Sequence, residues 1–162
     1  MRFLPATFLL LGLAACQAPT GFSAEQIAAL RGNGFQPVDE NWELGMADRL
    51  LFATDESRLD PVQEQNIGRM TGTLVGVGVR GARVEGHTDD TGAADYNEQL
   101  SLRRAGAVKQ AMVRGGMDDS AVHAIGRGSR APVETNRTAA GRRENRRVVI
   151  IVSPADAMPL PR

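Results

Sequence analysis

The stretch from Val84 to Arg104, VEGHTDDTGAADYNEQLSLRR, constrains the fold more than any other part of the 162-residue sequence. A β-rich run at Arg83–Thr88 ends in Gly-His-Thr-Asp, a polar turn follows, and Asp95 then caps a segment with helical spacing. Leu100 and Arg104 are four residues apart on this segment, so they share one helix face, which Leu100 turns towards the core. A strand, a turn and an amphipathic helix in succession predict an α/β fold in which Arg104 is at least half-buried.

Further strands and one further helix are predicted around this stretch. A short apolar strand is expected at Leu50–Thr54, and Asp60–Pro61 opens a helix, with Asp as the N-cap and Pro at the first position, that ends near Gly76–Gly78. Two more strands are expected at Ala121–Ile125 and Val148–Val152. The order β-α-β-α-β-β predicts an α/β sandwich with one mixed four-stranded sheet.

The remaining residues flank this domain, which is expected to span residues 48–153. Residues 16–47 are expected to form an N-terminal helix, capped by Ser23, and an arm that contains Trp42, the only tryptophan. Residues 154–162 contain three prolines and are expected to form a disordered tail.

Residues 1–15 have the pattern of a secretory signal, in which Arg2 precedes an apolar run and small residues. This run of about 14 residues is shorter than a membrane-spanning helix requires. Leu13-Ala14-Ala15-Cys16 resembles the bacterial lipobox, which implies cleavage before Cys16 and attachment of lipid to it, and Gln17 favours the outer membrane. The alternative is an ordinary secretion signal, which would leave Cys16 as an unpaired thiol in an oxidising compartment.

Asp89 and Arg104 are the candidate binding residues. The strand and the helix bring one carboxylate and one guanidinium together, a combination that suits a zwitterionic ligand. Asp89 would take an ammonium group, and Arg104 would hold a carboxylate in a bidentate fork. The alternative is a structural salt bridge between the two side chains, since a buried arginine needs a partner.

Composition and motif spacing argue against several other functions. Lys plus Arg and Asp plus Glu both number 19, so the charge balance does not favour nucleic acid. The basic cluster Arg142–Arg147 is expected to edge the ligand site instead. A single cysteine excludes an intramolecular disulfide, and His87 and His123 lack a third clustered ligand or a nucleophile motif. Catalysis, a metal and a cofactor are therefore not expected, although a hydrolase that uses His87 and Asp89 is a competing hypothesis.

Two segments, GHTDDTGAADYNEQLSLRRAGAV and GRG…P…NRTAAGRRENRRVVI, resemble the C-terminal, peptidoglycan-associated domain of the OmpA family over roughly residues 48–153. The resemblance implies non-covalent binding of peptidoglycan without catalysis. It also implies that Asp89 and Arg104 hold the amino-acid centre of diaminopimelate in the stem peptide. Further ligand contacts are expected from Thr88, Asn97 and Arg146.

The sequence departs from the family pattern just after Phe52. Family members often have an aspartate soon after this phenylalanine, where this chain has Ala53, then Thr54 and Asp55. Thr54 and Asp55 are expected to contact the ligand through backbone amides rather than through a side chain.

The N-terminal half resembles, more narrowly, signalling lipoproteins of the outer membrane within this family. That resemblance implies a periplasmic repressor as a partner, whose sequestration frees a membrane diguanylate cyclase, raises cyclic-di-GMP and favours biofilm. The arm residues Phe35, Trp42 and Leu44 would then bind the repressor. The alternatives are that Trp42 and Leu44 pack on the domain as part of its first strand, and that the protein is purely a tether between outer membrane and cell wall. A homodimer is a further possible assembly.

Overall fold

The computed structural model describes residues 21–52 and 56–157. Its strands are β1 (Gln36–Val38), β2 (Asn41–Ala47), β3 (Ala82–His87), β4 (Val122–Gly126) and β5 (Arg147–Val152). Its helices are α1 (Ala24–Gly32), α2 (Asp48–Leu51), α3 (Pro61–Gly76), α4 (Ala94–Arg114) and α5 (Ala139–Asn145), and two 3-10 turns are η1 (Asp119–Ala121) and η2 (Pro154–Asp156). None of the helices in these two ranges is both long enough and apolar enough to cross a membrane.

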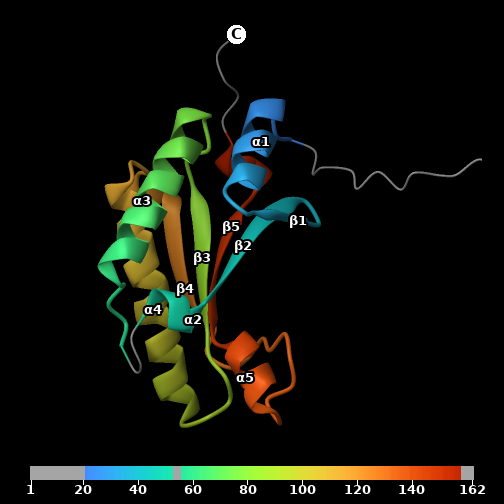
Figure 1. Cartoon of the computed structure of the whole chain (residues 1–162), viewed down its shortest axis with the longest axis vertical. Helices are drawn as coiled ribbons and strands as arrows, with labels where there is room; N and C mark the ends of the chain where they lie inside the picture. Colours follow the sequence, from blue (N-terminus) through green and yellow to red (C-terminus); the bar gives the residue numbers. More distant parts are fainter. Residues whose placement is uncertain (1–20, 53–55, 158–162) are drawn as a thin grey trace, which may run out of the picture.

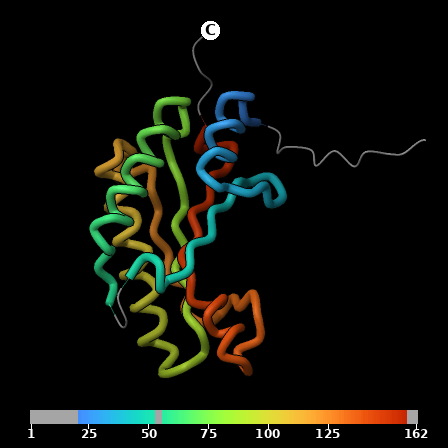
Figure 2. The backbone as a smooth tube through the Cα atoms, viewed as in Figure 1, coloured from blue at the N-terminus to red at the C-terminus, as the bar shows by residue number. Residues whose placement is uncertain are grey.

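The strands form one sheet in the order β1-β2-β5-β3-β4, and α3 and α4 cover one of its faces (Figure 1). Strand β3 runs parallel to β4, while the other neighbouring strands are antiparallel. The first and last parts of the described chain lie side by side, because β2 pairs with β5 from Trp42↔Val152 to Ala47↔Arg147 (Figure 2). Helix α1 lies at one end of the sheet, and α2 and α5 lie at the other (Figure 1).

The hydrophobic core fills the space between the sheet and the helices. Trp42 and Ile150 from the sheet are fully buried in it, together with Leu74 of α3 and Met112 of α4. Helix α1 extends the helical layer. It is held there by a hydrogen bond of 3.1 Å that the side-chain amide of Gln26 donates to the carbonyl oxygen of Val77. Leu30 from α1 is also fully buried.

The predicted α/β class with one mixed sheet is confirmed, but the first strand lies earlier in the chain than predicted. Residues Asp48–Leu51 form the short helix α2, and Phe52 makes only an isolated bridge with Leu59. A short apolar run such as Leu50–Phe52 fits a buried helix turn as well as a strand. The sheet has five strands rather than four because the β1–β2 hairpin, which was assigned to the arm, is paired with β5.

Two C-terminal segments also differ from the sequence prediction. Arg142 and Arg143 of the basic cluster lie on a helix that the sequence did not predict, α5, whose N-cap Thr138 accepts a hydrogen bond from the backbone N–H of Gly141. The predicted disordered tail begins too early, because Pro154–Asp156 forms η2 and Ala157 bridges Val79.

Candidate functional site

The predicted strand, turn and helix form the frame of the candidate site. The strand β3 ends at His87, and α4 begins at Ala94. The prediction that Asp95 caps this helix is wrong, because the N-cap is Ala93, which makes no side-chain cap, and Asp95 lies in the first turn, so the helix begins two residues earlier than predicted. Within the turn, Asp89 Oδ1 accepts a hydrogen bond of 2.9 Å from the backbone N–H of Thr91. Asn97 donates its amide to the carbonyl oxygens of Asp89 and Thr91, at 3.4 and 3.0 Å. The loop that carries Asp89 is therefore held against the first turn of α4.

Glycine lets α4 approach the sheet closely at this point. A Cβ atom at Gly86 would lie 2.0 Å from the carbonyl oxygen of Ser101, and one at Gly126 would lie 2.6 Å from that of Glu98. Ser101 also accepts a hydrogen bond of 2.9 Å from the backbone N–H of Gly128. These contacts set the position of α4 relative to the end of β3, and so the position of Arg104 relative to the Asp89 loop.

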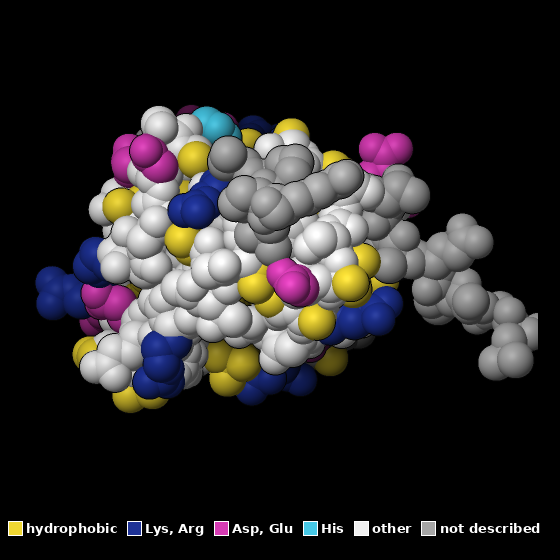
Figure 3. Space-filling model, turned by 90° about the horizontal axis from the view of Figure 1, so that it is seen from above, with side chains coloured by type: hydrophobic (Ala, Val, Ile, Leu, Met, Phe, Trp, Pro, Cys, Tyr) yellow, Lys and Arg dark blue, Asp and Glu magenta, His cyan; other side chains and the backbone are white. Residues whose placement is uncertain are grey.

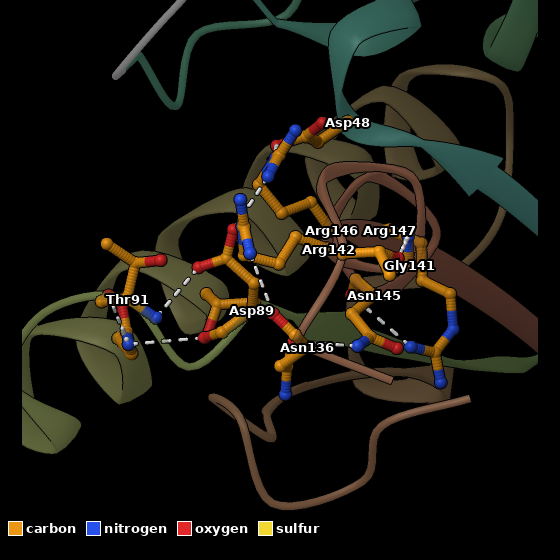
Figure 4. Close-up of polar contacts among 12 residues, drawn as sticks. Asp48, Asp89, Thr91, Asn136, Gly141, Arg142, Asn145, Arg146 and Arg147 are labelled. Carbon is orange, nitrogen blue, oxygen red and sulfur yellow. Dashed lines mark hydrogen bonds and ion pairs between the residues drawn. The ribbon is translucent and has the colours of Figure 1, made fainter. Parts of the chain in front are cut away.

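The structure pairs the two candidate residues with partners that the sequence did not predict. Arg104 Nη1 lies 3.0 Å from Asp48 Oδ2, and Arg146 Nη1 lies 2.6 Å from Asp89 Oδ2. Arg146 Nε lies 3.6 Å from Asp48 Oδ2, so Arg146 reaches towards both carboxylates (Figure 4). The alternative of a structural salt bridge between Asp89 and Arg104 themselves is therefore wrong, because each pairs with another side chain. The four side chains form an alternating series of Arg104, Asp48, Arg146 and Asp89, which we call the charge series.

The charge series lines an open cleft of about 1050 Å³. Of the other residues predicted to bind the ligand, Thr88 and Asn97 also line it. Phe52, Tyr96, Leu100 and Arg142 complete much of the wall. Charged and apolar surfaces thus face the same cavity, as in sites that bind a small polar group attached to a longer chain.

Arg104 is held in a fixed orientation on the wall of this cleft. Only 5% of the residue is exposed, as its place on the Leu100 face of the helix predicted. Its guanidinium lies 5.2 Å from the centre of the Phe52 ring, and its Nε donates a hydrogen bond of 3.1 Å to the carbonyl oxygen of Glu56. Stacking on an aromatic ring and a backbone acceptor orient the planar fork before any ligand is bound.

Asp89 is kept in its charged form by its surroundings. Burial raises the pKa of this carboxyl group, but hydrogen bonds from the backbone of Thr91 and from Arg146 outweigh burial, so the pKa lies below its usual range. At neutral pH the side chain therefore accepts hydrogen bonds and carries a negative charge, as an ammonium-binding group must.

Asp48 is the main site residue that sequence reasoning missed. It lies on α2 next to the end of β2, at the first residue of the predicted domain, and it is 56 positions from Arg104. Only 7% of it is exposed, and because a sequence does not display burial, nothing in this segment marked it as a site residue.

The predicted partner-binding residues lie mostly in the core. Phe35 and Trp42 are fully buried, and Leu44 is half-buried against the core. The Trp42 ring meets Phe22 edge to face at 6.5 Å, and the guanidinium of Arg31 lies 5.5 Å from its centre. This arrangement matches the alternative in which Trp42 packs as part of the first strand. A partner could reach Phe35 or Trp42 only if the segments packed over them moved.

Three other predicted residues, Cys16, Thr54 and Asp55, lie outside the described residues. At the end of the molecule that carries α1, the visible surface shows hydrophobic side chains scattered among charged and polar ones (Figure 3).

His87 does not share a site with Asp89. It does not line the cleft, and its Nε2 lies 3.7 Å from Glu85 Oε2. Its Nδ1 has no hydrogen-bond partner among the described residues, although only 4% of the residue is exposed. Residues 21–52 and 56–157 also contain no cluster of three or more His, Cys, Asp or Glu side chains that could hold a metal ion.

We expect His87 to make the stability of the fold depend on pH. Burial, with the nearby charge of Arg147, lowers the pKa of His87 to about 4, whereas an unfolded histidine has a pKa near 6.5. Below pH 6.5 the unfolded chain therefore binds a proton at His87, whereas the folded chain keeps this histidine neutral until the pH approaches 4. The free energy of unfolding should fall as the pH drops from 6.5 towards 4, by roughly 1–2 kcal/mol between pH 7 and pH 5.

Urea unfolding of the wild type and of His87→Gln at pH 7 and pH 5 would measure this contribution. The variant should lose less stability on acidification than the wild type. His123→Gln is the matched control, since His123 is exposed. Equal pH dependence in all three proteins would contradict the prediction.

Comparison with known proteins places these features in a family. The model of the OmpA family matches residues 51–146. The outer-membrane lipoprotein YfiB of Pseudomonas aeruginosa is 44% identical over 147 residues, covering 89% of this chain and 88% of its own length. The putative lipoprotein YfiB of Escherichia coli is 41% identical over 151 residues, covering 92% of this chain and 94% of its own.

A solved structure supports the same assignment. The peptidoglycan-associated lipoprotein from Burkholderia pseudomallei superimposes with a TM-score of 0.56 at 25% identity, over 63% of this chain and 86% of that one. The family match covers the strand, turn and helix that carry Asp89 and Arg104, and the two lipoprotein relatives match nearly the whole chain. The chain therefore belongs to the OmpA family, among its outer-membrane lipoproteins.

Proposed function

We propose that this lipoprotein binds peptidoglycan non-covalently by holding the amino-acid centre of diaminopimelate in the cleft. The observation that carries the proposal is the charge series, which offers two carboxylates and two guanidiniums along one open wall. In the stem peptide of peptidoglycan, diaminopimelate presents an ammonium and a carboxylate on one carbon atom. The name of the peptidoglycan-associated lipoprotein, whose fold is similar, supports the same ligand.

Each charged group of the ligand has a suitable partner in the cleft. Asp89, an anion at neutral pH, would accept hydrogen bonds from the ammonium. Arg104, oriented by Phe52 and the carbonyl oxygen of Glu56, would hold the carboxylate. Charge-assisted hydrogen bonds of this kind are about twice as strong as neutral ones. The apolar side of the cleft, including Leu100 and Tyr96, would receive the methylene chain between the two centres of diaminopimelate.

Co-sedimentation of the full chain with purified sacculi tests the proposal. Free meso-diaminopimelate should release the bound protein, because it offers the same amino-acid centre. Pimelate, which has the two carboxylates and the carbon chain but no amines, should leave the protein bound at the same concentration. Equal release by the two compounds would show that the cleft does not recognise an amino-acid centre.

The same sacculi test the absence of catalysis. Prolonged incubation with the protein should release no soluble fragments of the wall. Release of fragments would overturn the view that the protein binds peptidoglycan without cleaving it.

A second function concerns the N-terminal arm. The similarity to the two YfiB lipoproteins extends over most of the chain, well beyond residues 51–146, and so includes β1 and β2. We infer that the protein also sequesters a YfiR-like periplasmic repressor and thereby activates a diguanylate cyclase, raising cyclic-di-GMP and favouring biofilm. Because Phe35 and Trp42 are fully buried, binding through them requires this part of the chain to move, and we propose that β2 leaves β5.

A reversible cross-link between these strands would test this requirement. Gly45 and Val149 are paired across β2 and β5, and paired strand residues lie within the distance that a disulfide spans. The double variant Gly45→Cys/Val149→Cys should bind a purified YfiR-like repressor only after reduction. Undiminished binding in the oxidised state would show that the repressor does not need a detached arm, and no binding by the wild type would favour the purely structural tether.

A further inference from the structure

The carboxylate assigned to the ligand ammonium already holds a cation in the structure. Arg146 Nη1 donates a hydrogen bond of 2.6 Å to Asp89 Oδ2 (Figure 4). A ligand ammonium that reached Asp89 would meet the like charge of this guanidinium at the same carboxylate. The contact therefore bears directly on which ligands the cleft accepts.

We propose that Arg146 is a specificity-determining residue, a built-in cation that the ligand ammonium displaces from Asp89 and that then pairs with Asp48. This inference rests on the proposed function, since it concerns the same cleft and the same amino-acid centre. Binding becomes an exchange of one cation for another at Asp89. A ligand without a free ammonium cannot replace Arg146 at Asp89.

The geometry provides both the mobility and the second partner that the exchange needs. The Arg146 side chain is 33% exposed, whereas that of Arg104 is 7% exposed. Arg146 Nε already lies 3.6 Å from Asp48 Oδ2, so a small rotation of the side chain would complete this second pair. An ionised carboxylate has about four acceptor positions, which lets Asp48 serve Arg104 and Arg146 together.

The backbone of Arg146 can remain in place while its side chain moves. Its carbonyl oxygen accepts a hydrogen bond of 3.1 Å from the N–H of Asp48, and its own N–H donates to the carbonyl oxygen of Arg142 at 3.1 Å. The exchange is therefore a change of side-chain rotamer at a fixed position. No charge is left unpaired after it, because Asp89 holds the ligand and Arg146 holds Asp48.

The exchange makes the cleft selective for a free amine. When the ligand amine is acylated, the group is neutral and cannot replace the guanidinium at Asp89. Arg146 then keeps its place at Asp89, and the acylated amine forms no ion pair in the cleft. The analogue loses the charge-assisted contact that the free amine makes, so the cleft discriminates against it.

Titration calorimetry on the full chain in detergent can test this with two stem tripeptides. Both carry L-alanine, acetylated at its amine, then γ-D-glutamate and meso-diaminopimelate, and they differ only in whether the remaining diaminopimelate amine is free or acetylated. In Arg146→Gln the competing cation is gone, so the free-amine peptide should bind about two- to fivefold tighter than to wild type, as expected for loss of one partly exposed ion pair. The acetylated peptide should gain nothing.

Two further variants act as controls. Arg146→Lys keeps a cation at this position and should bind both peptides as the wild type does. Arg143→Gln removes the same charge three residues earlier, on α5, but Arg143 is exposed and does not line the cleft, so it should change neither affinity. Thermal melts by circular dichroism would confirm that all variants fold.

The outcomes separate this inference from the proposed function. If the wild type binds neither peptide, the proposed function fails and the inference fails with it. If the wild type binds the free-amine peptide but Arg146→Gln weakens both peptides, Arg146 is a direct ligand contact and the exchange is overturned. An equal gain for both peptides would also overturn it, because displacement by an ammonium would then play no part.

Discussion

Replacement of Asp89 by asparagine is expected to abolish co-sedimentation with sacculi while the chain stays folded. Asparagine keeps the shape of the side chain and an oxygen that can accept the hydrogen bond from Thr91. It removes the negative charge that would hold the ligand ammonium. Loss of one partner of a hydrogen-bonded charge pair in an interface costs about 2–5 kcal/mol, so the affinity should fall by about 30-fold or more.

Asp90→Asn is the matched control for this experiment. It removes the same charge from the neighbouring residue, which is exposed and does not line the cleft. Its co-sedimentation should equal that of the wild type, and circular dichroism should show the same fold for both variants. If Asp89→Asn sedimented as fully as Asp90→Asn, the cleft would not be the peptidoglycan site.

Replacement of Gly86 by alanine is expected to cause the largest loss of stability. The new methyl group would lie 2.0 Å from the carbonyl oxygen of Ser101 and 2.7 Å from its carbonyl carbon. These are backbone atoms, so α4 would have to move away from β3. We expect a loss of about 3–5 kcal/mol, at or above the upper end for overpacked cores. The melting temperature should fall by roughly 10 °C or more.

A glycine of α4, Gly106, provides the control. A Cβ at Gly106 would meet no atom within 4 Å, and alanine is the better helix former, so Gly106→Ala should raise stability by about 0.5–1 kcal/mol. Thermal and urea unfolding followed by circular dichroism would compare the two variants. Unchanged stability in Gly86→Ala would mean that α4 can shift without loss of packing.

The local structure around the cleft could be predicted from the sequence because its signals are local. The turn residues before Asp95 and the apolar spacing after it predicted the start of α4 to within two residues. The four-residue step from Leu100 predicted the burial of Arg104, which is 5% exposed. Caps and helix faces depend on neighbours three or four positions away, which a sequence displays directly.

The ion pairs could not be predicted in this way, because tertiary structure determines them. Asp48 is 56 positions from Arg104, and Arg146 is 57 positions from Asp89. Their meeting depends on where β2 ends relative to β5, and the first strand was predicted several residues too late. The alternation of Trp42, Leu44 and Met46 was the available signal for β2, but the apolar run at Leu50–Phe52 competed with it.

The pairing of β2 with β5 determines how the protein would carry a mechanical load. The described chain enters through α1 at one end of the sheet, and the cleft lies by α2 and α5 at the other end (Figure 1). A pull between these ends acts along the axis of β2. Hydrogen bonds between strands run across that axis. The six residue pairs from Trp42↔Val152 to Ala47↔Arg147 would therefore be loaded in shear, and they would resist the pulling force together rather than open one after another. The force would then pass from Ala47 directly into Asp48 and the arginines of the cleft.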